Sequence, residues 1–273
     1  MPIYDFNHAL LRAPSRSVVD GLSATGLGRP GFAAILREHT AYARALEETG
    51  ISVEILPPLE PYPDSVFVED SALVFADAAI VLRPGAPTRR GEAAEIAPAL
   101  ARHFDRMLFL KNGSVDGGDV LTTPGNVFIG QSARTDAQGA QALIALLDEI
   151  GLRGLAVETP AGVLHFKSDC SLLDEETVLS TARLAASGVF SGLRVVLVPQ
   201  GEEGAANAVR LKDRLLISDA FPRTTELLTN AGYKIAPLAT REIAKLDAGL
   251  SCMSLRWSAA QSRTPQALPP STS

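Results

Sequence analysis

Short apolar segments separated by tight turns recur along the chain. Residues 66–75 and 78–82 are two such segments, and Ala76-Asp77 lies between them. Turn-type residues between two apolar runs of strand length are typical of β-hairpins. Similar pairs follow at residues 119–130, 170–180 and 207–218, and a fifth begins at Ser251. The pattern therefore predicts five hairpins, whose reference positions are Asp70, Asp119, Asp169, Asn207 and Cys252.

Amphipathic stretches lie between these hairpins. In residues 89–104, Ile96 and Leu100 are spaced for one helical face, and residues 135–149 show the same spacing of leucines after a predicted Thr135 capping box. Helices are also expected at residues 32–48, 222–230 and 240–247. A repeated hairpin-plus-helix unit predicts internal pseudosymmetry, with strands converging on an axis and helices outside.

These units indicate one α/β domain over residues 1–257. The segment 258–273 is rich in proline and serine, so a disordered tail is expected there.

Charged residues interrupt three of the apolar segments, which we expect to be strands: 64–70, 115–121 and 163–168. Burying an unpaired carboxylate is costly, so acids in such surroundings are expected to have partners. A thiol at Cys252, an imidazole at His165 and several inward acids on separate strand ends predict one site assembled from distant segments. Such an arrangement is more typical of an enzyme than of a scaffold.

The composition argues against several classes of function. A net charge of −6 gives no basic footprint, so nucleic-acid binding is disfavoured, and no apolar run approaches the ~20 residues that span a membrane. The two cysteines form no disulfide framework or metal motif, and no secretory signal is visible, so a cytoplasmic location is expected. Nucleotide-binding and zinc-hydrolase motifs are also missing from the sequence.

Six motifs, in order between about residue 5 and residue 257, resemble the motif series of the dimethylarginine dimethylaminohydrolases. They are residues 64–70, 83–92, 116–119, 132–136, 164–168 and 250–254. The resemblance implies the five-bladed α/β propeller of the guanidine-modifying (pentein) superfamily, built from ββαβ modules. It also implies hydrolysis of asymmetric dimethylarginine and monomethylarginine to citrulline plus dimethylamine or methylamine, without a cofactor or metal.

The resemblance assigns three catalytic residues. Cys252 is similar to the family nucleophile, because a thiolate can add to a guanidinium carbon and leave a covalent thiouronium intermediate. His165 corresponds to the general acid–base, and Asp116 to the acid that orients it. Cys170 has no counterpart in this pattern and is expected to be structural, while His8, His39 and His103 are expected to be solvated.

The substrate is a small zwitterion with a cationic head, so its site needs both signs of charge. By the same resemblance, an acidic group clasps the guanidinium and ammonium, an arginine pair binds the α-carboxylate, and two backbone carbonyls touch the substrate. These residues are Asp64, Glu69 and Asp70; Arg89 and Arg134; and Leu22, in a predicted lid at residues 17–28, and Leu246.

Two other functions remain open at the level of sequence. An arginine deiminase would share the fold and the catalytic set, and a catalytically silent arginine-binding protein would share the pocket. The intact Cys252, His165 and Asp116 argue against the silent protein. The preference between methylated substrates is undecided, as is the oligomeric state, for which a homodimer is one alternative.

Overall fold

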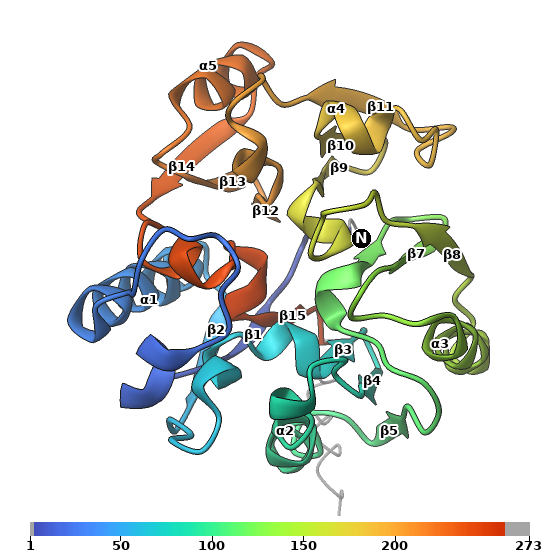
Figure 1. Cartoon of the computed structure of the whole chain (residues 1–273). Helices are drawn as coiled ribbons and strands as arrows, with labels where there is room; N and C mark the ends of the chain where they lie inside the picture. The colour runs from blue at the N-terminus through green and yellow to red at the C-terminus, as the bar shows by residue number, and fades with distance from the viewer. Residues whose placement is uncertain (1–2, 260–273) are drawn as a thin grey trace, which may run out of the picture.

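Five small sheets are arranged around a central axis in the computed structural model, which describes residues 3–259 (Figure 1). Within that range each sheet has three strands: an inner strand antiparallel to the middle strand, which is parallel to the outer strand. The expected α/β propeller of five ββαβ modules is therefore confirmed.

The first four sheets use strands that are consecutive in the chain. In order, they are β3 (Ala72–Val74), β4 (Ala78–Val81) and β5 (Arg106–Phe109); β6 (Val120–Thr122), β7 (Val127–Gln131) and β8 (Gly154–Glu158); β9 (Cys170–Asp174), β10 (Thr177–Ser180) and β11 (Arg194–Leu197); and β12 (Val209–Leu211), β13 (Arg214–Ser218) and β14 (Lys234–Leu238).

The fifth sheet joins the two ends of the described chain. Its inner strand is β15 (Leu255–Trp257), and its other strands are β1 (His8–Arg12) and β2 (Ser52–Leu56). The β1–β15 pairing places His8 opposite Trp257. Ala259 also bonds to the Asn7 side chain, so the first two residues of the predicted tail pack on the fold. The rest of that tail lies outside the described residues.

A helix connects the middle strand to the outer strand in every module and lies at the periphery of the propeller (Figure 1). The expected helices near residues 32, 89, 135 and 222 are present, although the third begins at Ala137 and is capped by Asp136 rather than by a Thr135 capping box. The Thr135 hydroxyl instead donates to Asp119. The helices are α1 (Phe32–Glu47), α2 (Glu92–Leu100), α3 (Ala137–Glu149), α4 (Ala182–Ala185) and α5 (Pro222–Asn230).

The charged parts of these motif segments are not strands, contrary to expectation, although Val120 and Leu121 begin β6. They form short 3-10 turns that lead into the inner strands, close to the axis. Aspartate and serine favour turns because their side chains bond to nearby backbone groups in place of a ladder, and glycine does so because it lacks a Cβ. The turns are η2 (Pro63–Val66), η3 (Val68–Ser71), η5 (Gly117–Asp119), η6 (Phe166–Ser168), η7 (Glu203–Ala206) and η9 (Ser251–Met253). Residues 240–247 likewise contain a 3-10 turn, η8 (Ile243–Leu246), in place of the expected helix.

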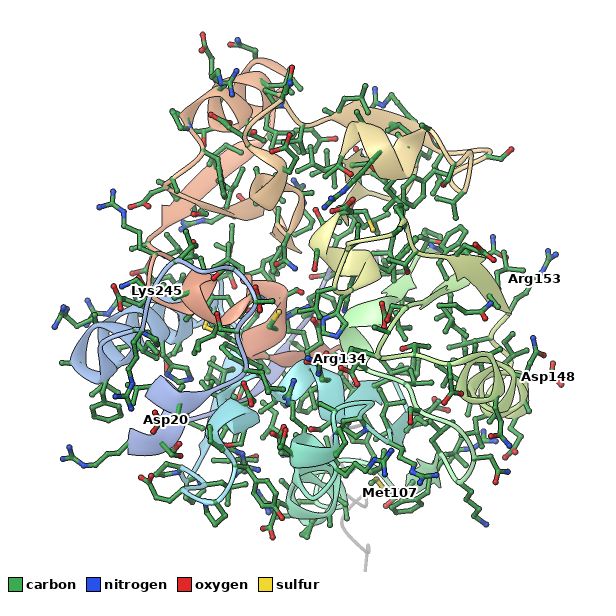
Figure 2. The ribbon with its side chains drawn as sticks, in the orientation of Figure 1. Asp20, Met107, Arg134, Asp148, Arg153 and Lys245 are labelled. Atoms are coloured by element: carbon green, nitrogen blue, oxygen red, sulfur yellow. The ribbon has the colours of Figure 1, made fainter. Side chains whose placement is uncertain are left out.

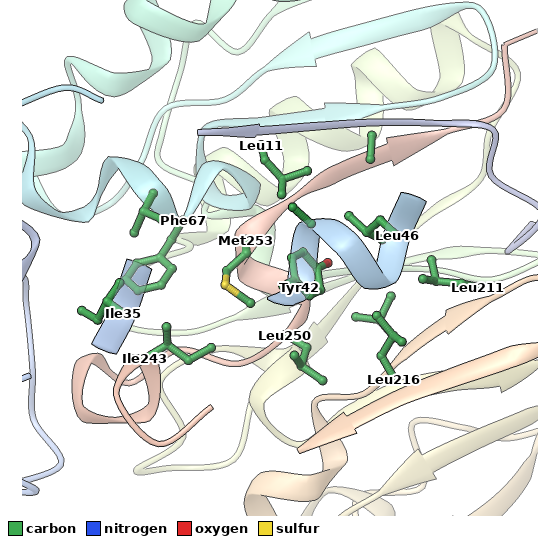
Figure 3. Close-up of a cluster of buried hydrophobic side chains, with 14 of the residues drawn as sticks. Leu11, Ile35, Tyr42, Leu46, Phe67, Leu211, Leu216, Ile243, Leu250 and Met253 are labelled. Carbon is green, nitrogen blue, oxygen red and sulfur yellow. The ribbon is translucent and has the colours of Figure 1, made fainter. Parts of the chain in front are cut away.

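One apolar cluster supports the end of the chain that carries Cys252. Leu250 and Met253 flank this cysteine and are each 1% exposed, packed with Tyr42 and Leu46 of α1 (Figure 3). The Tyr42 hydroxyl also hydrogen bonds to Ser254 Oγ at 2.6 Å. Tight packing of Leu250 and Met253 therefore fixes the position of the turn that carries Cys252.

Two histidines are not solvated as expected. His39 lies on the core-facing side of α1 at 3% exposure, and burial lowers its pKa to about 4. His8 is half-buried in β1 and stacks on Trp257, with ring centroids 5.4 Å apart. Among the described residues, no helix has the length and apolar character needed to cross a membrane.

Candidate active site

A cavity of about 30 Å³ lies where the 3-10 turns meet at one end of the axis. Most of the residues expected to form the site line it: Leu22, Asp64, Asp70, Arg89, Arg134, His165, Leu246 and Cys252. Phe67, Leu164, Asp247 and Ala248 complete the wall. Segments more than 200 residues apart in the sequence therefore converge on one small space, as the charged motifs predicted.

Asp116 and His165 form a buried pair beside this cavity. His165 Nε2 lies 2.9 Å from Asp116 Oδ2, and Asp116 is completely buried. Burial by itself would lower the pKa of His165, but the charge of Asp70 and the bond to Asp116 raise it to about 9. The imidazole is therefore protonated near neutral pH. Its Nδ1 has no hydrogen bond among the described residues and remains free to transfer a proton.

Gly118 allows His165 and Asp70 to approach each other. Its N–H donates to Asp70 Oδ1 at 2.8 Å, while a Cβ at this position would lie 2.7 Å from His165 Nδ1. Burial would raise the pKa of Asp70, but the charges of His165 and Arg89 together with this N–H lower it to about 2. Asp70 is therefore a carboxylate at neutral pH, as a partner for a guanidinium must be.

Cys252 lies within η9, and its thiol is not activated in the empty cavity. Burial and the negative charges of Glu69 and Asp70 raise the pKa of Cys252 to about 12. The Gly249 N–H, 3.4 Å from Sγ, opposes this shift only in part. A cation placed against Asp70 would offset the acids and favour the thiolate.

Arg89 is nearly saturated by its neighbours. It bonds to Asp70 and Glu92, and its Nη2 also reaches the carbonyls of Asp64 and Phe67 at 3.2 and 2.9 Å. Burial would lower the pKa of Arg89, but Asp70 and Glu92 keep it well above its usual value. Arg89 lines the cavity, yet few of its donors remain for a ligand.

Arg134 keeps most of its donors free. It lies near the centre of the view, where the turns of different modules meet, whereas Arg153 lies at the rim (Figure 2). The Arg134 Nη1 atom lies 3.8 Å from Asp116 Oδ2. This distance is that of an ion pair and is too long for a hydrogen bond. Of the two arginines assigned to the α-carboxylate, Arg134 has the greater capacity to bind one.

The predicted lid is closed over the cavity. The Leu22 N–H donates to Asp64 Oδ1 at 2.9 Å, and the Ala24 N–H donates to Asp247 Oδ2 at 2.6 Å. Ser23 Oγ also bonds to the Lys245 carbonyl at 2.6 Å. The space beneath the lid is about 30 Å³, far less than an amino acid requires. Ligand entry therefore requires these contacts to open.

Asp247 was not anticipated from the sequence. It follows η8 in the left-handed region at φ 58°, a conformation that aspartate adopts more readily than most residues. Its carboxylate accepts a hydrogen bond from the Ala24 N–H of the lid, and Asp247 also lines the cavity. No motif marked this position.

Glu69 does not line this cavity, although it was expected to bind substrate. Its carboxylate points behind the Cys252 turn, where it accepts from Lys167 Nζ at 2.5 Å and from Ser251 Oγ at 2.8 Å. The Glu69 carboxylate therefore connects the segment that carries His165, through Lys167, to the turn that carries Cys252, through Ser251. Glu69 thus contacts His165 and Cys252 only through their neighbours.

Asn207 makes a second connection between the same two segments. Its Nδ2 donates to the Lys167 carbonyl at 3.0 Å and to Ser251 Oγ at 3.1 Å, and its Oδ1 accepts from the Ser251 N–H at 2.9 Å. A Cβ on Gly249 would lie 2.4 Å from the Asn207 side chain. Sequence reasoning noted Asn207 only as a repeat position and missed this role.

Asp119 connects the turn that carries Asp116 to the turn that carries His165. Its Oδ1 accepts from the Phe166 N–H at 2.8 Å, and its Oδ2 accepts from Thr135 Oγ1 at 2.7 Å. Burial raises its pKa. The only sequence signal for this function was again its repeat position.

One group of side chains has the spacing of a metal site. Ligand atoms of Asp70, Asp116 and His165 lie within 4.8 Å of one another. The oxygens of both acids already accept hydrogen bonds from Arg89, Gly118, Gly85 or His165. These existing bonds fit an orienting network better than a vacant set of metal ligands.

Comparison with known proteins identifies several relatives. No family model matches the chain. A dimethylarginine dimethylaminohydrolase from Pseudomonas aeruginosa is 38% identical over 92% of this chain and all of that protein. Another from Streptomyces coelicolor is 35% identical over 91% of this chain and 96% of that protein.

Solved structures agree with these sequence relatives. A cysteine-to-serine mutant of the P. aeruginosa enzyme, in complex with citrulline, superposes with a TM-score of 0.89 at 36% identity and covers 93% of this chain and all of its own. The N-terminal domain of ArgZ, a cyanobacterial arginine dihydrolase, has a TM-score of 0.82 and covers 92% of this chain and 97% of its own. At 16% identity, this second likeness concerns the fold alone.

Proposed function

The chain belongs to the dimethylarginine dimethylaminohydrolase family, and we propose that it hydrolyses asymmetric dimethylarginine and monomethylarginine to citrulline and the corresponding methylamine. The observation that carries the proposal is the shared cavity of Cys252, His165 and Asp70. It places a soft nucleophile, a protonated imidazole and a carboxylate around a space that a guanidinium group would occupy. Cys170 and Cys252 are both free thiols, as is usual in a reducing compartment, and this supports a cytoplasmic location.

Substrate binding prepares the nucleophile. The guanidinium pairs with Asp70, whose charge it neutralises, so the pKa of Cys252 falls from its raised value of about 12 in the free protein. The thiol proton leaves to solvent, and the thiolate adds to the guanidinium carbon. His165, which is already protonated, is the acid for the next step.

The first half-reaction releases the amine. Carbon–nitrogen bond cleavage takes a proton from His165 and expels dimethylamine or methylamine, leaving the substrate carbon attached to Cys252 as a thiouronium. Asp116 stabilises the imidazolium before this transfer and keeps the ring oriented afterwards. The neutral imidazole that results is now a base.

The second half-reaction consumes water. His165 accepts a proton from a water molecule, whose oxygen adds to the thiouronium carbon. The carbon–sulfur bond then breaks, the thiolate of Cys252 leaves, and loss of one proton gives the neutral urea group of citrulline. One water is used for each amine released.

The remaining wall of the cavity would bind the amino-acid end. We propose that Arg134 binds the α-carboxylate, with Arg89 positioning Asp70 and contributing at most one donor. Asp64 and the backbone carbonyls of Leu22 and Leu246 would then face the α-ammonium. Because Asp64 also holds the Leu22 N–H, ligand binding and lid closure would share one residue.

A side-by-side assay of citrulline formation tests this proposal against its alternatives. We expect monomethyl- and asymmetric dimethylarginine to exceed arginine in kcat/KM by at least about tenfold, a gap of about 1.4 kcal/mol in transition-state stabilisation. The expected reason is that Leu22 and Phe67 offer apolar contacts to N-methyl groups. A preference for arginine would indicate a deiminase, and binding of all three without turnover would indicate a silent binding protein.

A further inference from the structure

A larger cavity lies at the other end of the propeller axis, and we propose that it binds a small amphipathic anion. Its volume is about 680 Å³, within the range of roughly 300–1,000 Å³ typical of small-molecule sites. The inner strands β3, β6, β9, β12 and β15 all contribute to its wall. The proposed reaction makes no use of this space.

A layer of polar contacts separates this cavity from the candidate active site. Glu69, Lys167 and Ser251 line the larger cavity, and they are joined by the bonds from Lys167 and Ser251 to the Glu69 carboxylate. The active-site cavity is lined by the turns before the inner strands, whereas the hairpin ends at Phe75 and Thr123 line the larger one. The two spaces are therefore distinct.

The floor of the larger cavity carries more positive than negative charge. Lys167 Nζ and Arg256 Nη2 lie 2.5 and 3.6 Å from the same oxygen of Glu69, so two cations share one carboxylate. Arg256 Nε is buried and has no hydrogen-bond partner among the described residues. The other acid in the lining, Asp77, lies exposed at a hairpin turn.

Arg210 adds a third positive charge to the wall. Its guanidinium lies over the rings of Tyr4 and Tyr233, 5.2 and 5.6 Å from their centroids, and its Nε donates to the Lys212 carbonyl. Within residues 3–259, no carboxylate forms an ion pair with it. Aromatic faces hold a guanidinium in place without neutralising it, so the charge is available to a ligand.

The rest of the wall is mainly apolar. Leu73, Leu121, Leu172 and Trp257 are buried residues that contribute to it. A fully polar anion would leave the apolar wall in contact with water, and a neutral apolar molecule would leave the cations without a partner. A molecule with one anionic group on an aromatic or acyl body satisfies both parts of the cavity.

Two fluorescent probes with the same body test the proposal. 8-Anilino-1-naphthalenesulfonate carries the anionic group, and N-phenyl-1-naphthylamine lacks it. We expect one saturable site for the sulfonate, with an affinity at least about tenfold higher than that of the neutral probe, because the neutral probe gains no charge pairing. Equal affinity of the two probes for the wild-type protein would overturn the proposal.

Four variants at three arginines locate the binding site. Arg210→Gln should weaken binding of the sulfonate at least about fivefold and leave the neutral probe unaffected, whereas Arg210→Lys should retain most of the preference. Arg214→Gln, on the exposed end of β13, is the matched surface control, and Arg134→Gln reports on the active-site cavity. Loss of binding in either of these two variants, with Arg210→Gln unchanged, would place the probe elsewhere and exclude this site. Should Arg210→Gln fail to fold, the probe pair on the wild-type protein still tests the proposal.

Discussion

The turns before β12 and β15 have the same position in their modules but contribute differently to the site. η9 contains Cys252, whose sulfur lines the active-site cavity. η7 is followed by Asn207, which lies outside that cavity and bonds to the backbone of Ser251 and Lys167. One turn thus places a thiol at the cavity, and the other holds the neighbouring turns in place.

The comparison indicates that the repeat supplies positions rather than chemistry. Asp70, Asp119 and Asn207 all occur at module turns, yet only Asp70 lines the active-site cavity, and the other two tie adjacent turns together. A propeller that brings five turns to one axis can therefore use some for reaction and others for alignment. The variants below test that division.

The largest effect is expected from Cys252→Ser. If η9 presents the nucleophile, turnover should fall by about 10⁴-fold or more, because a serine hydroxyl is a much weaker nucleophile toward a guanidinium carbon. Cys170→Ser is the matched control, since Cys170 is fully buried in β9 and bonds to the Phe166 carbonyl. Steady-state citrulline formation measures both. Near-normal turnover by Cys252→Ser would remove the proposed role of η9.

A side chain at Gly118 should have the next largest effect. The added methyl of Gly118→Ala would lie within 3 Å of both His165 and Asp70, so the two groups must separate. Displacement of catalytic groups by about 1 Å costs about 10²-fold, and we expect a loss of that size in kcat. Gly125→Ala, where an added Cβ meets nothing within 4 Å, is the control. Equal effects of the two substitutions would contradict this account.

Asn207→Ala tests the aligning turn and should have a moderate effect. Removing the amide leaves the Ser251 N–H and the Lys167 carbonyl without their partner, which should lower kcat about tenfold while changing KM little. The rate of Cys252 alkylation by a substrate-like guanidine should fall in parallel. Asn230→Ala, at the exposed end of α5, provides the control. A change confined to thermal stability would assign Asn207 to the fold alone.

The last prediction compares no variants and concerns the pH dependence of the free thiol. The pKa of Cys252 is raised to about 12, so the thiolate is scarce at pH 7 and its fraction grows about tenfold per pH unit. Alkylation of Cys252 by iodoacetamide without substrate should therefore keep rising from pH 7 to pH 10. A plateau near pH 9 would show that the acids around η9 do not suppress the thiolate.

Much of the architecture is predictable from local patterns. Hairpins are recognisable because turn residues separate two apolar runs, and α1 and α5 because apolar residues recur at helical spacing. The acidic segments were harder, since alternation over a few residues resembles a strand although the structure forms 3-10 turns at 64–71. Their burial was expected correctly, but from the wrong local geometry.

Only part of the candidate site could be predicted from the sequence. Cys252, His165 and Asp70 could be singled out because their chemistry is distinctive for the reaction. Asn207 could not, because its partner Ser251 lies in another module and amide–backbone bonds leave no pattern in the sequence. The near-saturation of Arg89 by Glu92 was invisible for the same reason, since arginine and glutamate three residues apart usually form a surface pair.

The pairing of β1 with β15 also sets the order in which the molecule can be completed. β1 leaves the ribosome before every other described strand, and its partner β15 leaves last. Closing a loop of about 250 residues costs roughly 5 kcal/mol in chain entropy, and the β1–β15 pairing can offset that cost only when the final strand arrives. During synthesis the middle strand of the fifth sheet therefore keeps an unpaired edge, which is open to contacts with other chains. Because Cys252 directly precedes β15, the nascent protein has no complete reaction site until the ring is closed.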